Sequence, residues 1–206
     1  MYRILNVGMT AGTAVLLLSV QAAWAQADHL APATDHAQQA ATHGGMGHAE
    51  ILVQHATMAL THAELAGDEN PYAVAAAASL QEAITHGNMG HTEIATGRVS
   101  RGLTHLRVAV HVGLAMDHGK QAVNHGGMGH ARLVVTHAEL ALTHAQAAAE
   151  ISDSPHIALA IQGLQSAVNH GGIGQTEINN GRRERGLAST GRATRSAQEA
   201  LNHLGM

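Results

Sequence analysis

Histidine is the residue type whose number and spacing stand out in this chain of 206 residues. The sequence contains 18 histidines and no cysteine. Neutral imidazole is the commonest protein ligand for transition metals, and it also gains a proton near neutral pH. Because there is no cysteine, disulfides, thiolate metal sites and thiol catalysis are excluded. Imidazole is the side chain in excess, so the question is what the histidines are for.

Most of the histidines recur every seven residues in four runs. Seven residues span nearly two helical turns, so each run forms one stripe with members about 10.5 Å apart. Metal–nitrogen bonds are about 2 Å long, so one ion cannot be held by two members of a stripe. Ligands must come from different helices. The runs are His29, His36 and His43; His48, His55 and His62; His111, His118 and His125; and His130, His137 and His144.

A hexapeptide connects the runs and recurs along the chain. It reads HGGMGH at 43–48 and 125–130, HGNMGH at 86–91 and HGGIGQ at 170–175. Glycine is favoured just past a helix end, so each copy predicts a short turn between antiparallel helices. The segments after the first and third copies match, as do those after the second and fourth. A unit of about 83 residues is thus duplicated.

These turns predict which histidines face each other. In an antiparallel hairpin, facing position numbers have a constant sum, and here the sums are 91 in the first hairpin and 255 in the third. On a helical wheel the histidines fall in the middle of the apolar sector, so their rings should face inward or toward a helix seam. The predicted metal-binding pairs are His29/His62, His36/His55, His43/His48, His86/His91, His111/His144, His118/His137 and His125/His130.

The second and fourth hairpins have fewer histidine pairs. His105 and His170 remain candidate metal ligands there, although neither is expected to face another histidine. The other facing positions expected are Ser79 with Arg98, Tyr72 with His105, His170 with Gln175, Gly163 with Arg182, and His156 with Ser189.

A histidine pair supplies two nitrogen ligands, whereas a metal site requires about four donor atoms. Water, a pair on a packed neighbour or a carboxylate must complete it. Nitrogen-rich sites suit Cu(II), Ni(II), Zn(II) and Co(II), with Cu(II) bound most tightly. The nearby carboxylates Glu50, Glu93, Glu139 and Glu177 are either ligands or, as we favour, solvated groups and acceptors that orient imidazole. Met46, Met89 and Met128 are either thioether donors for Cu(I) or, by preference, apolar plugs at the bundle end.

Helices must position these side chains, and the composition predicts an all-α fold. The apolar fraction is 45%, much of it alanine, and the aromatic residues are Tyr2, Trp24 and Tyr72. Such a core favours closely packed helices over sheets. We expect eight helices in two tandem antiparallel four-helix units, residues 26–109 and 110–206. The join near Gly113 has no strong breaker, so helices four and five alternatively continue as one. The expected helices are 28–43, 47–66, 71–86, 90–109, 111–125, 129–150, 155–170 and 174–203.

The N-terminus is typical of an export signal. Arg3 is followed by an apolar run and by the small-x-small sequence Ala23-Trp24-Ala25. We therefore predict that residues 1–25 are a signal peptide cleaved after Ala25, which makes the mature protein periplasmic in a Gram-negative source. The apolar run is too short for a spanning helix, so no membrane association is expected.

Several function classes are disfavoured. The formal charge of −4 and the shortage of aromatic residues argue against nucleic-acid binding. The sequence has no catalytic triad, phosphate-binding loop or HExxH helix, and no inward carboxylate set for a di-iron bundle, so we predict that it is not an enzyme. The arginines between 182 and 195 form a solvated face or dock an acidic partner.

The combination of motifs resembles a known family. His-Gly-x-x-Gly-His between alanine-rich helices, with the runs HATMALTHA at 55–63 and HAELALTHA at 137–145, is similar to the small metal-binding proteins of the bacterial periplasm. Those are histidine-rich helical bundles, of roughly half this length, that take up several divalent ions, copper prominently. The likeness covers the mature chain twice and implies that the motif and heptad histidines are metal ligands. The family usually has charged residues in the turn, where this chain has Met46, Met89, Met128 and Ile173.

We therefore expect a monomeric, exported protein that buffers or sequesters copper first, and also nickel or zinc. Binding should weaken below about pH 6, because protons compete for imidazole. The alternative is a periplasmic stress or interaction protein that responds to metal or pH and acts on a partner through its arginine-rich end.

Overall fold

The computed structural model describes residues 12–205, and their side chains from His29 onward. This part of the chain folds into helices and short turns, without a strand, which confirms the all-α prediction. It has seven helices rather than the expected eight. They are α1 (Gly12–Gly45), α2 (Ala49–Leu65), α3 (Pro71–Asn88), α4 (Thr92–Gly127), α5 (Ala131–Ala149), α6 (Pro155–Asn179) and α7 (Arg183–Leu204).

The difference in number comes from α4, which continues through the expected join. Gly113 lies within this helix of 36 residues. An isolated glycine costs a helix only about 1 kcal/mol relative to alanine, and its neighbours Val112 and Ala115 are fully buried. The prediction of two separate helices was therefore wrong, and the alternative of one continuous helix is confirmed.

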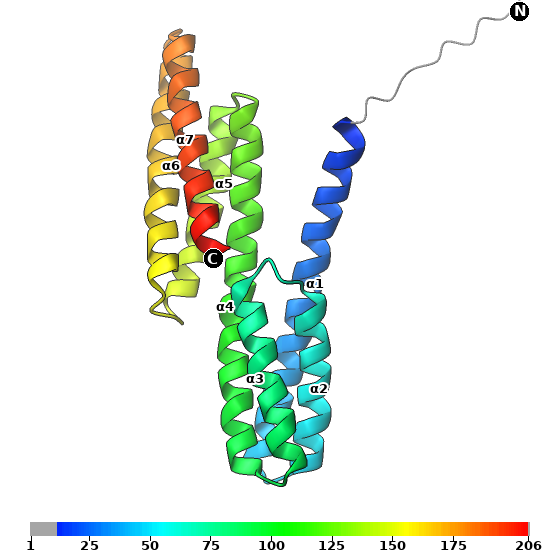
Figure 1. The fold of residues 1–206 in the computed structure, drawn as a ribbon. Coiled ribbons are helices and arrows are strands. Elements are labelled where there is room, and N and C mark those ends of the chain that lie inside the picture. Colours follow the sequence, from blue (N-terminus) through cyan, green and yellow to red (C-terminus); the bar gives the residue numbers. More distant parts are fainter. Residues whose placement is uncertain (1–11, 206) are drawn as a thin grey trace, which may run out of the picture.

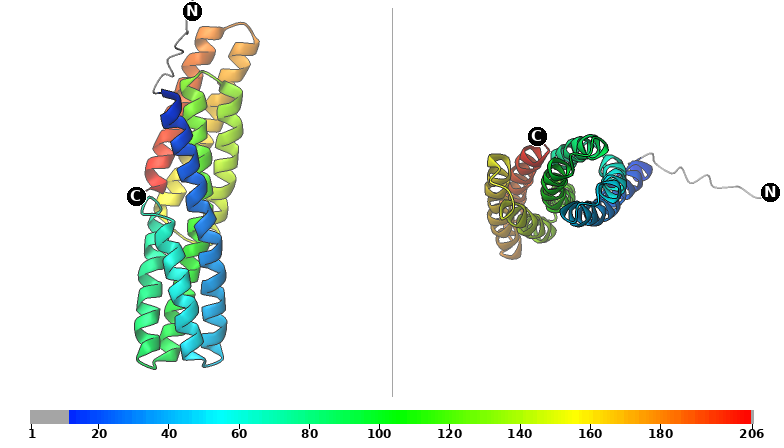
Figure 2. Two further views of the ribbon diagram at one scale, coloured as in Figure 1. Left: turned by 90° about the vertical axis from the view of Figure 1, so that its right-hand side faces the viewer. Right: turned by 90° about the horizontal axis from the view of Figure 1, so that it is seen from below.

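Helix α4 belongs to two bundles (Figure 1). Its first half forms one bundle with α1, α2 and α3, and its second half forms another with α5, α6 and α7. In each bundle, consecutive helices are neighbours, and the ring is closed by α1 against α4 or by α4 against α7. Figure 2 shows the two bundles displaced along and beside this shared helix.

Alanine dominates both cores, with a few larger side chains between the helices. The first core contains Leu52, Leu80 and Leu106, and the second contains Ile157 and Leu164, all almost fully buried among alanines. Small side chains let helix axes approach closely. Tyr72 packs against both cores.

The loop between α2 and α3 is fastened to the middle of α4. Asn70 is buried and caps α3 by accepting a hydrogen bond from the backbone N–H of Tyr72. Its side-chain amide donates to the carbonyl of Ala109 at 2.7 Å. This contact ties the first bundle to the shared helix near the point where the second bundle begins.

The last turn lies elsewhere than predicted. Helix α6 continues through the fourth hexapeptide, and the chain reverses at Gly181, whose φ of 75° matches the 76° of Gly90. The N–H of Arg182 donates to the carbonyl of Glu177 at 2.9 Å, as His48 does to His43 in the first turn. The turn has moved seven residues along the chain, because Asn179-Asn180-Gly181 is a strong helix stop.

This displacement corrects the predicted pairing in the last hairpin. With the turn at Gly181, the facing position sum becomes 359 instead of 345. A Cβ placed on Gly163 would lie 3.1 Å from the carbonyl of Ser196, in agreement with this register. The tip of α6 and α7 consequently projects beyond the α4–α5 turn (Figures 1 and 2). The facing positions are now Glu177 with Arg182, His170 with Ser189, Gly163 with Ser196, and His156 with His203.

The predicted signal peptide falls partly on residues 1–11, which lie outside the described residues. Residues 12–25 form the beginning of α1. Export and cleavage after Ala25 remain predictions. Among the helices searched in the described part of the chain, none has the length and hydropathy needed to cross a membrane.

Candidate metal sites

The heptad histidines line the seams between paired helices. In α2 the fully buried positions are Leu52, Ala56 and Ala59, whereas His55 is half-buried. Met58, on the other side of the histidine stripe, is 39% exposed. The histidines thus lie at the edge of the buried face, about 70° from its centre. Their predicted place in the middle of the buried sector was wrong, since alanine rather than Met58 or Leu65 faces the core. The seam alternative is confirmed.

The seam between α1 and α2 contains six imidazoles, which we call the first column. The facing rings have centroids 5.6–5.7 Å apart, and their Nδ1 atoms point toward each other. The predicted register of this hairpin is therefore confirmed. The Nδ1–Nδ1 distances are 3.3 Å for His29 and His62, 3.5 Å for His36 and His55, and 3.4 Å for His43 and His48.

The first column is continuous, which the sequence did not predict. The ring of His36 faces His55, and its centroid also lies 5.9 Å from that of His62. The ring centroids of His43 and His55 lie 5.7 Å apart. These contacts between successive pairs are nearly parallel, at 11° and 7°. The rings therefore alternate between α1 and α2 in one zigzag stack. Its order is His29, His62, His36, His55, His43 and His48.

The seam between α4 and α5 contains the second column, with the same arrangement. Its facing rings have centroids 5.8–5.9 Å apart, and its cross contacts measure 5.9 and 5.2 Å, both at 6°. The six-ring pattern is thus reproduced in both copies of the repeat. The order is His111, His144, His118, His137, His125 and His130.

The inward nitrogens fit a metal ion. Two nitrogens on one tetrahedral ion with bonds of about 2.0–2.1 Å lie about 3.3–3.4 Å apart, which matches the first column. In the second column, the Nδ1 atoms of His111, His118, His125 and His137 are buried without a hydrogen-bond partner. Leaving such an atom without a partner is costly, and a cation between the rings would provide one. The rings themselves are half-buried or exposed, so ions can reach the seam.

Protonation of these rings competes with metal. A hydrogen bond between two Nδ1 atoms needs one N–H donor and one bare nitrogen, so that N–H must lose its proton before both nitrogens of a pair can bind one ion. Burial, followed by the charges of neighbouring histidines, lowers the pKa of His55, His137 and His144. Burial therefore favours the neutral form of these three imidazoles, which is the form that binds metals.

The second hairpin has one histidine pair. His86 and His91 have ring centroids 5.8 Å apart, and the Nδ1 of His86 is buried without a partner. At the next facing position Arg98 forms an ion pair with Glu82 at 3.0 Å. His105 is half-buried, and burial and then the charge of Arg101 lower its pKa. The structure brings no second imidazole to it, so its role as a ligand stays a prediction.

The last hairpin pairs different side chains. Glu177 forms an ion pair with Arg182 beside the turn. His170 faces the buried Ser189 rather than Gln175, and its Nδ1 is buried without a partner. His156 and His203 face each other by register, but their rings do not touch. The α6–α7 hairpin thus has the spacing of the columns without their paired rings.

In the part of the chain that the structure describes, no third imidazole or carboxylate ligand completes a pair. Among the side chains that the structure describes, no group of three or more His, Asp or Glu residues converges on one point. Glu50, Glu93 and Glu139 are exposed, and Glu177 is occupied by Arg182. The carboxylates therefore do not coordinate beside the rings in this conformation.

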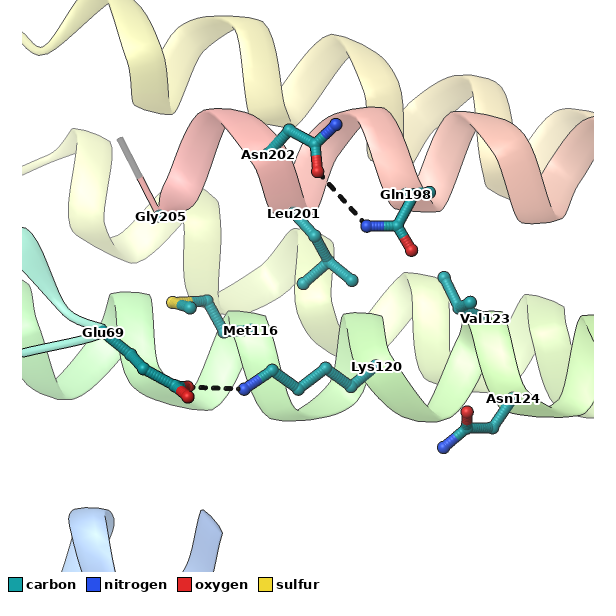
Figure 3. A pocket seen from close by; sticks show the side chains of 9 residues that line it. All are labelled: Glu69, Met116, Lys120, Val123, Asn124, Gln198, Leu201, Asn202 and Gly205. Atoms are coloured by element: carbon teal, nitrogen blue, oxygen red, sulfur yellow. Dashed lines mark hydrogen bonds and ion pairs between the residues drawn. The ribbon is translucent and has the colours of Figure 1, made fainter. Parts of the chain in front are cut away.

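A groove of about 450 Å³ lies apart from the columns, between α4 and α7 (Figure 3). Lys120 pairs with Glu69 there at 3.0 Å, and Met116 and Leu201 provide its apolar part. Its lining, taken from the described residues, includes no histidine. The groove is a junction between α7, α4 and the α2–α3 loop rather than part of the imidazole sites.

The comparisons with known proteins agree with this geometry. The model of the family described as small metal-binding protein matches residues 4–109 and again residues 107–206. The two matches together span nearly the whole chain and meet within α4, consistent with a tandem duplication. No curated protein matches the chain.

Proposed function

Since the chain belongs to the small metal-binding protein family, we propose that it binds several transition-metal ions on facing histidine pairs and thereby buffers or sequesters them. One observation supports this most strongly. Fourteen of the 18 histidines form seven facing ring pairs. Repeated two-nitrogen sites without a catalytic arrangement suit storage better than reaction chemistry.

Copper is the first metal of the proposal. Cu(II) binds nitrogen ligands more tightly than Ni(II), Co(II) or Zn(II). The Nδ1 spacing at rest suits tetrahedral ions such as zinc, whereas adjacent ligands of a square-planar ion lie about 2.8 Å apart, so Cu(II) requires each pair to close slightly. Water molecules complete the coordination in either case. We further propose that the protein is exported and works in the periplasm, on the basis of residues 1–25.

Metal titration of the full chain, followed by elemental analysis of the dialysed complex, tests this proposal. Several bound ions per chain are expected, with release on acidification toward about pH 5 as protons occupy the imidazoles. Binding of one ion or none would contradict buffering. Competition among Cu(II), Ni(II), Zn(II) and Co(II) in the same assay ranks the metals.

The second candidate is a metal- or pH-responsive interaction protein. The projecting α6–α7 tip, with exposed Arg183 and Arg185, favours it as a docking point for an acidic partner. A sensor needs few sites, whereas a buffer uses many. A small fixed stoichiometry together with metal-dependent capture by the tip would support this second role.

A further inference from the structure

Three hairpin turns expose a methionine between their paired histidines. Met46, Met89 and Met128 are 56%, 53% and 58% exposed. Side chains that plug a bundle end would be covered, so the preferred apolar-plug interpretation was wrong. Thioethers in solvent contribute little to packing here, which leaves their repeated presence without a structural reason.

Methionine occurs in the turns that have a histidine pair and not in the α6–α7 turn, which lacks one. The α6–α7 turn has Asn180 at the position next to its glycine, with Glu177 and Arg182 in place of the two histidines. Its backbone geometry equals that of the other turns, so the turn itself does not require methionine. In the fourth hexapeptide, which lies inside α6, Ile173 has replaced methionine and Gln175 has replaced histidine.

The turn pairs are also the most accessible. His48, His91 and His130 are exposed, whereas the histidines of the inner pairs are half-buried. The Nδ1 atoms of His43 and His48 lie 3.4 Å apart, close to the roughly 3.5 Å separation of two ligands in a three-coordinate site with 2.0 Å bonds. Soft thioether ligands select Cu(I), and a methionine side chain is flexible enough to reorient.

We propose that these three turns are two-nitrogen, one-thioether sites for soft monovalent cations, namely Cu(I) or its analogue Ag(I). The inner pairs, which have only imidazole donors, hold divalent ions. The inference rests on the histidine pairs of the proposed function and adds a second class of site. Each site consists of the two histidines and the methionine of one turn: His43, Met46 and His48; His86, Met89 and His91; and His125, Met128 and His130.

The sites have a defined placement in the molecule. A Cβ on Gly44 would meet Thr96, and one on Gly87 would meet Val53, so the first two turns lie at the same end of the first bundle. Figure 1 shows this end opposite the junction with the second bundle, and it shows the third turn at the far end of α4. The soft-ion sites are therefore terminal, and the divalent sites lie between them.

The test compares the full chain with the variant M46L/M89L/M128L. Leucine keeps the volume and removes the sulfur. Anaerobic titration with Cu(I) against bicinchoninate should show that the variant loses affinity by at least about tenfold at three sites, since even outer-shell ligand partners are worth about 10–100-fold. X-ray absorption should detect copper–sulfur scattering in the parent and not in the variant. The matched control M58L, which lies on α2 away from the turns, should retain both.

Zinc titration of the same proteins separates this inference from the proposed function. Zinc binding should be equal in the parent and the triple variant. If the triple variant binds Cu(I) as tightly as the parent, or if the parent shows no copper–sulfur scattering, the thioether sites are wrong while zinc binding stands. If neither protein binds zinc, the histidine-pair function fails. Circular dichroism verifies that the helical content is unchanged.

Discussion

The α1–α2 and α6–α7 hairpins have the same turn geometry but different side chains at their facing positions. Both turns use a glycine of positive φ and a 2.9 Å hydrogen bond between the flanking residues. In α1–α2, every seventh residue counted away from the turn is a histidine on both helices. The α6–α7 hairpin presents instead Glu177 with Arg182, His170 with Ser189, Gly163 with Ser196, and His156 with His203.

This comparison separates the scaffold from its ligands. The close approach of α6 and α7 does not depend on imidazole, because Gly174 and Gly186 let their backbones come within van der Waals contact. The histidines of the columns are therefore additions to a seam that helix packing already forms. Ligand pairs can be removed or introduced at facing positions without redesigning the fold.

The largest expected effect follows from removing the central pair of each column. The variant H36A/H55A/H118A/H137A should bind about two fewer divalent ions per chain, because each removed pair takes both nitrogens of a site. The matched variant H156A/H170A/H203A removes the histidines at the corresponding facing positions of the last hairpin. It should bind as many divalent ions as the parent. Elemental analysis after zinc loading measures both. Equal loss in the two variants would refute the distinction between the hairpins.

A converse experiment introduces a pair where the comparison finds none. The variant E177H/R182H places two histidines beside the α6–α7 turn, in the positions that His86 and His91 occupy in α3–α4. We expect about one additional zinc ion per chain, since the facing geometry is already present. The variant E177Q/R182Q controls for loss of the ion pair, whose Arg182 side chain is 49% exposed, so that solvent weakens its contribution to stability. An unchanged stoichiometry in the histidine variant would show that turn geometry alone is insufficient.

A third pair of variants tests the displaced turn. Gly181→Ala should lower the free energy of unfolding by about 1–2 kcal/mol, because an alanine at φ 75° is strained. Gly172→Ala should raise it by about 0.5–1 kcal/mol, because this residue lies inside α6 with open space at its Cβ. Urea denaturation gives both values. Unchanged or raised stability of Gly181→Ala would contradict a left-handed turn at residue 181.

The smallest effect concerns pH and the metal-free protein. The pKa values of His55, His137 and His144 are lowered in the folded chain, chiefly by burial. The unfolded chain therefore binds more protons below about pH 6.5, and the free energy of unfolding should decrease as the pH falls from there. Replacing the three by glutamine should flatten this dependence, measured as urea midpoints between about pH 7.5 and 5.5.

The ring pairs could be predicted from the sequence because helices and short turns leave little freedom. Once two heptad runs flank a six-residue turn, the constant sum determines which rings face each other. His29 and His62, separated by 33 positions, were identified in this way. The same reasoning located the pair beside the second turn, at His86 and His91.

The position of the last turn, the stagger of paired helices and the buried face of α2 could not be predicted from residue spacing alone. Both Gly174 and Gly181 are suitable helix stops, and the preceding Asn179 and Asn180 decide between them. The stagger that makes each column continuous depends on how far one helix slides along its partner, and the residue pattern leaves that distance undetermined. The buried face was misplaced because Ala56 and Ala63, which are weakly hydrophobic, fill the core while Met58 does not.

Helix α4 implies a rule for how such a chain can grow. It closes the first bundle and opens the second, so the second bundle required three new helices rather than four. A third copy of the repeat, joined in the same way through α7, would again add three. Capacity would then increase along a rod whose bundles are joined by uninterrupted helices rather than by flexible linkers. A designer could lengthen the protein copy by copy without inventing a new interface.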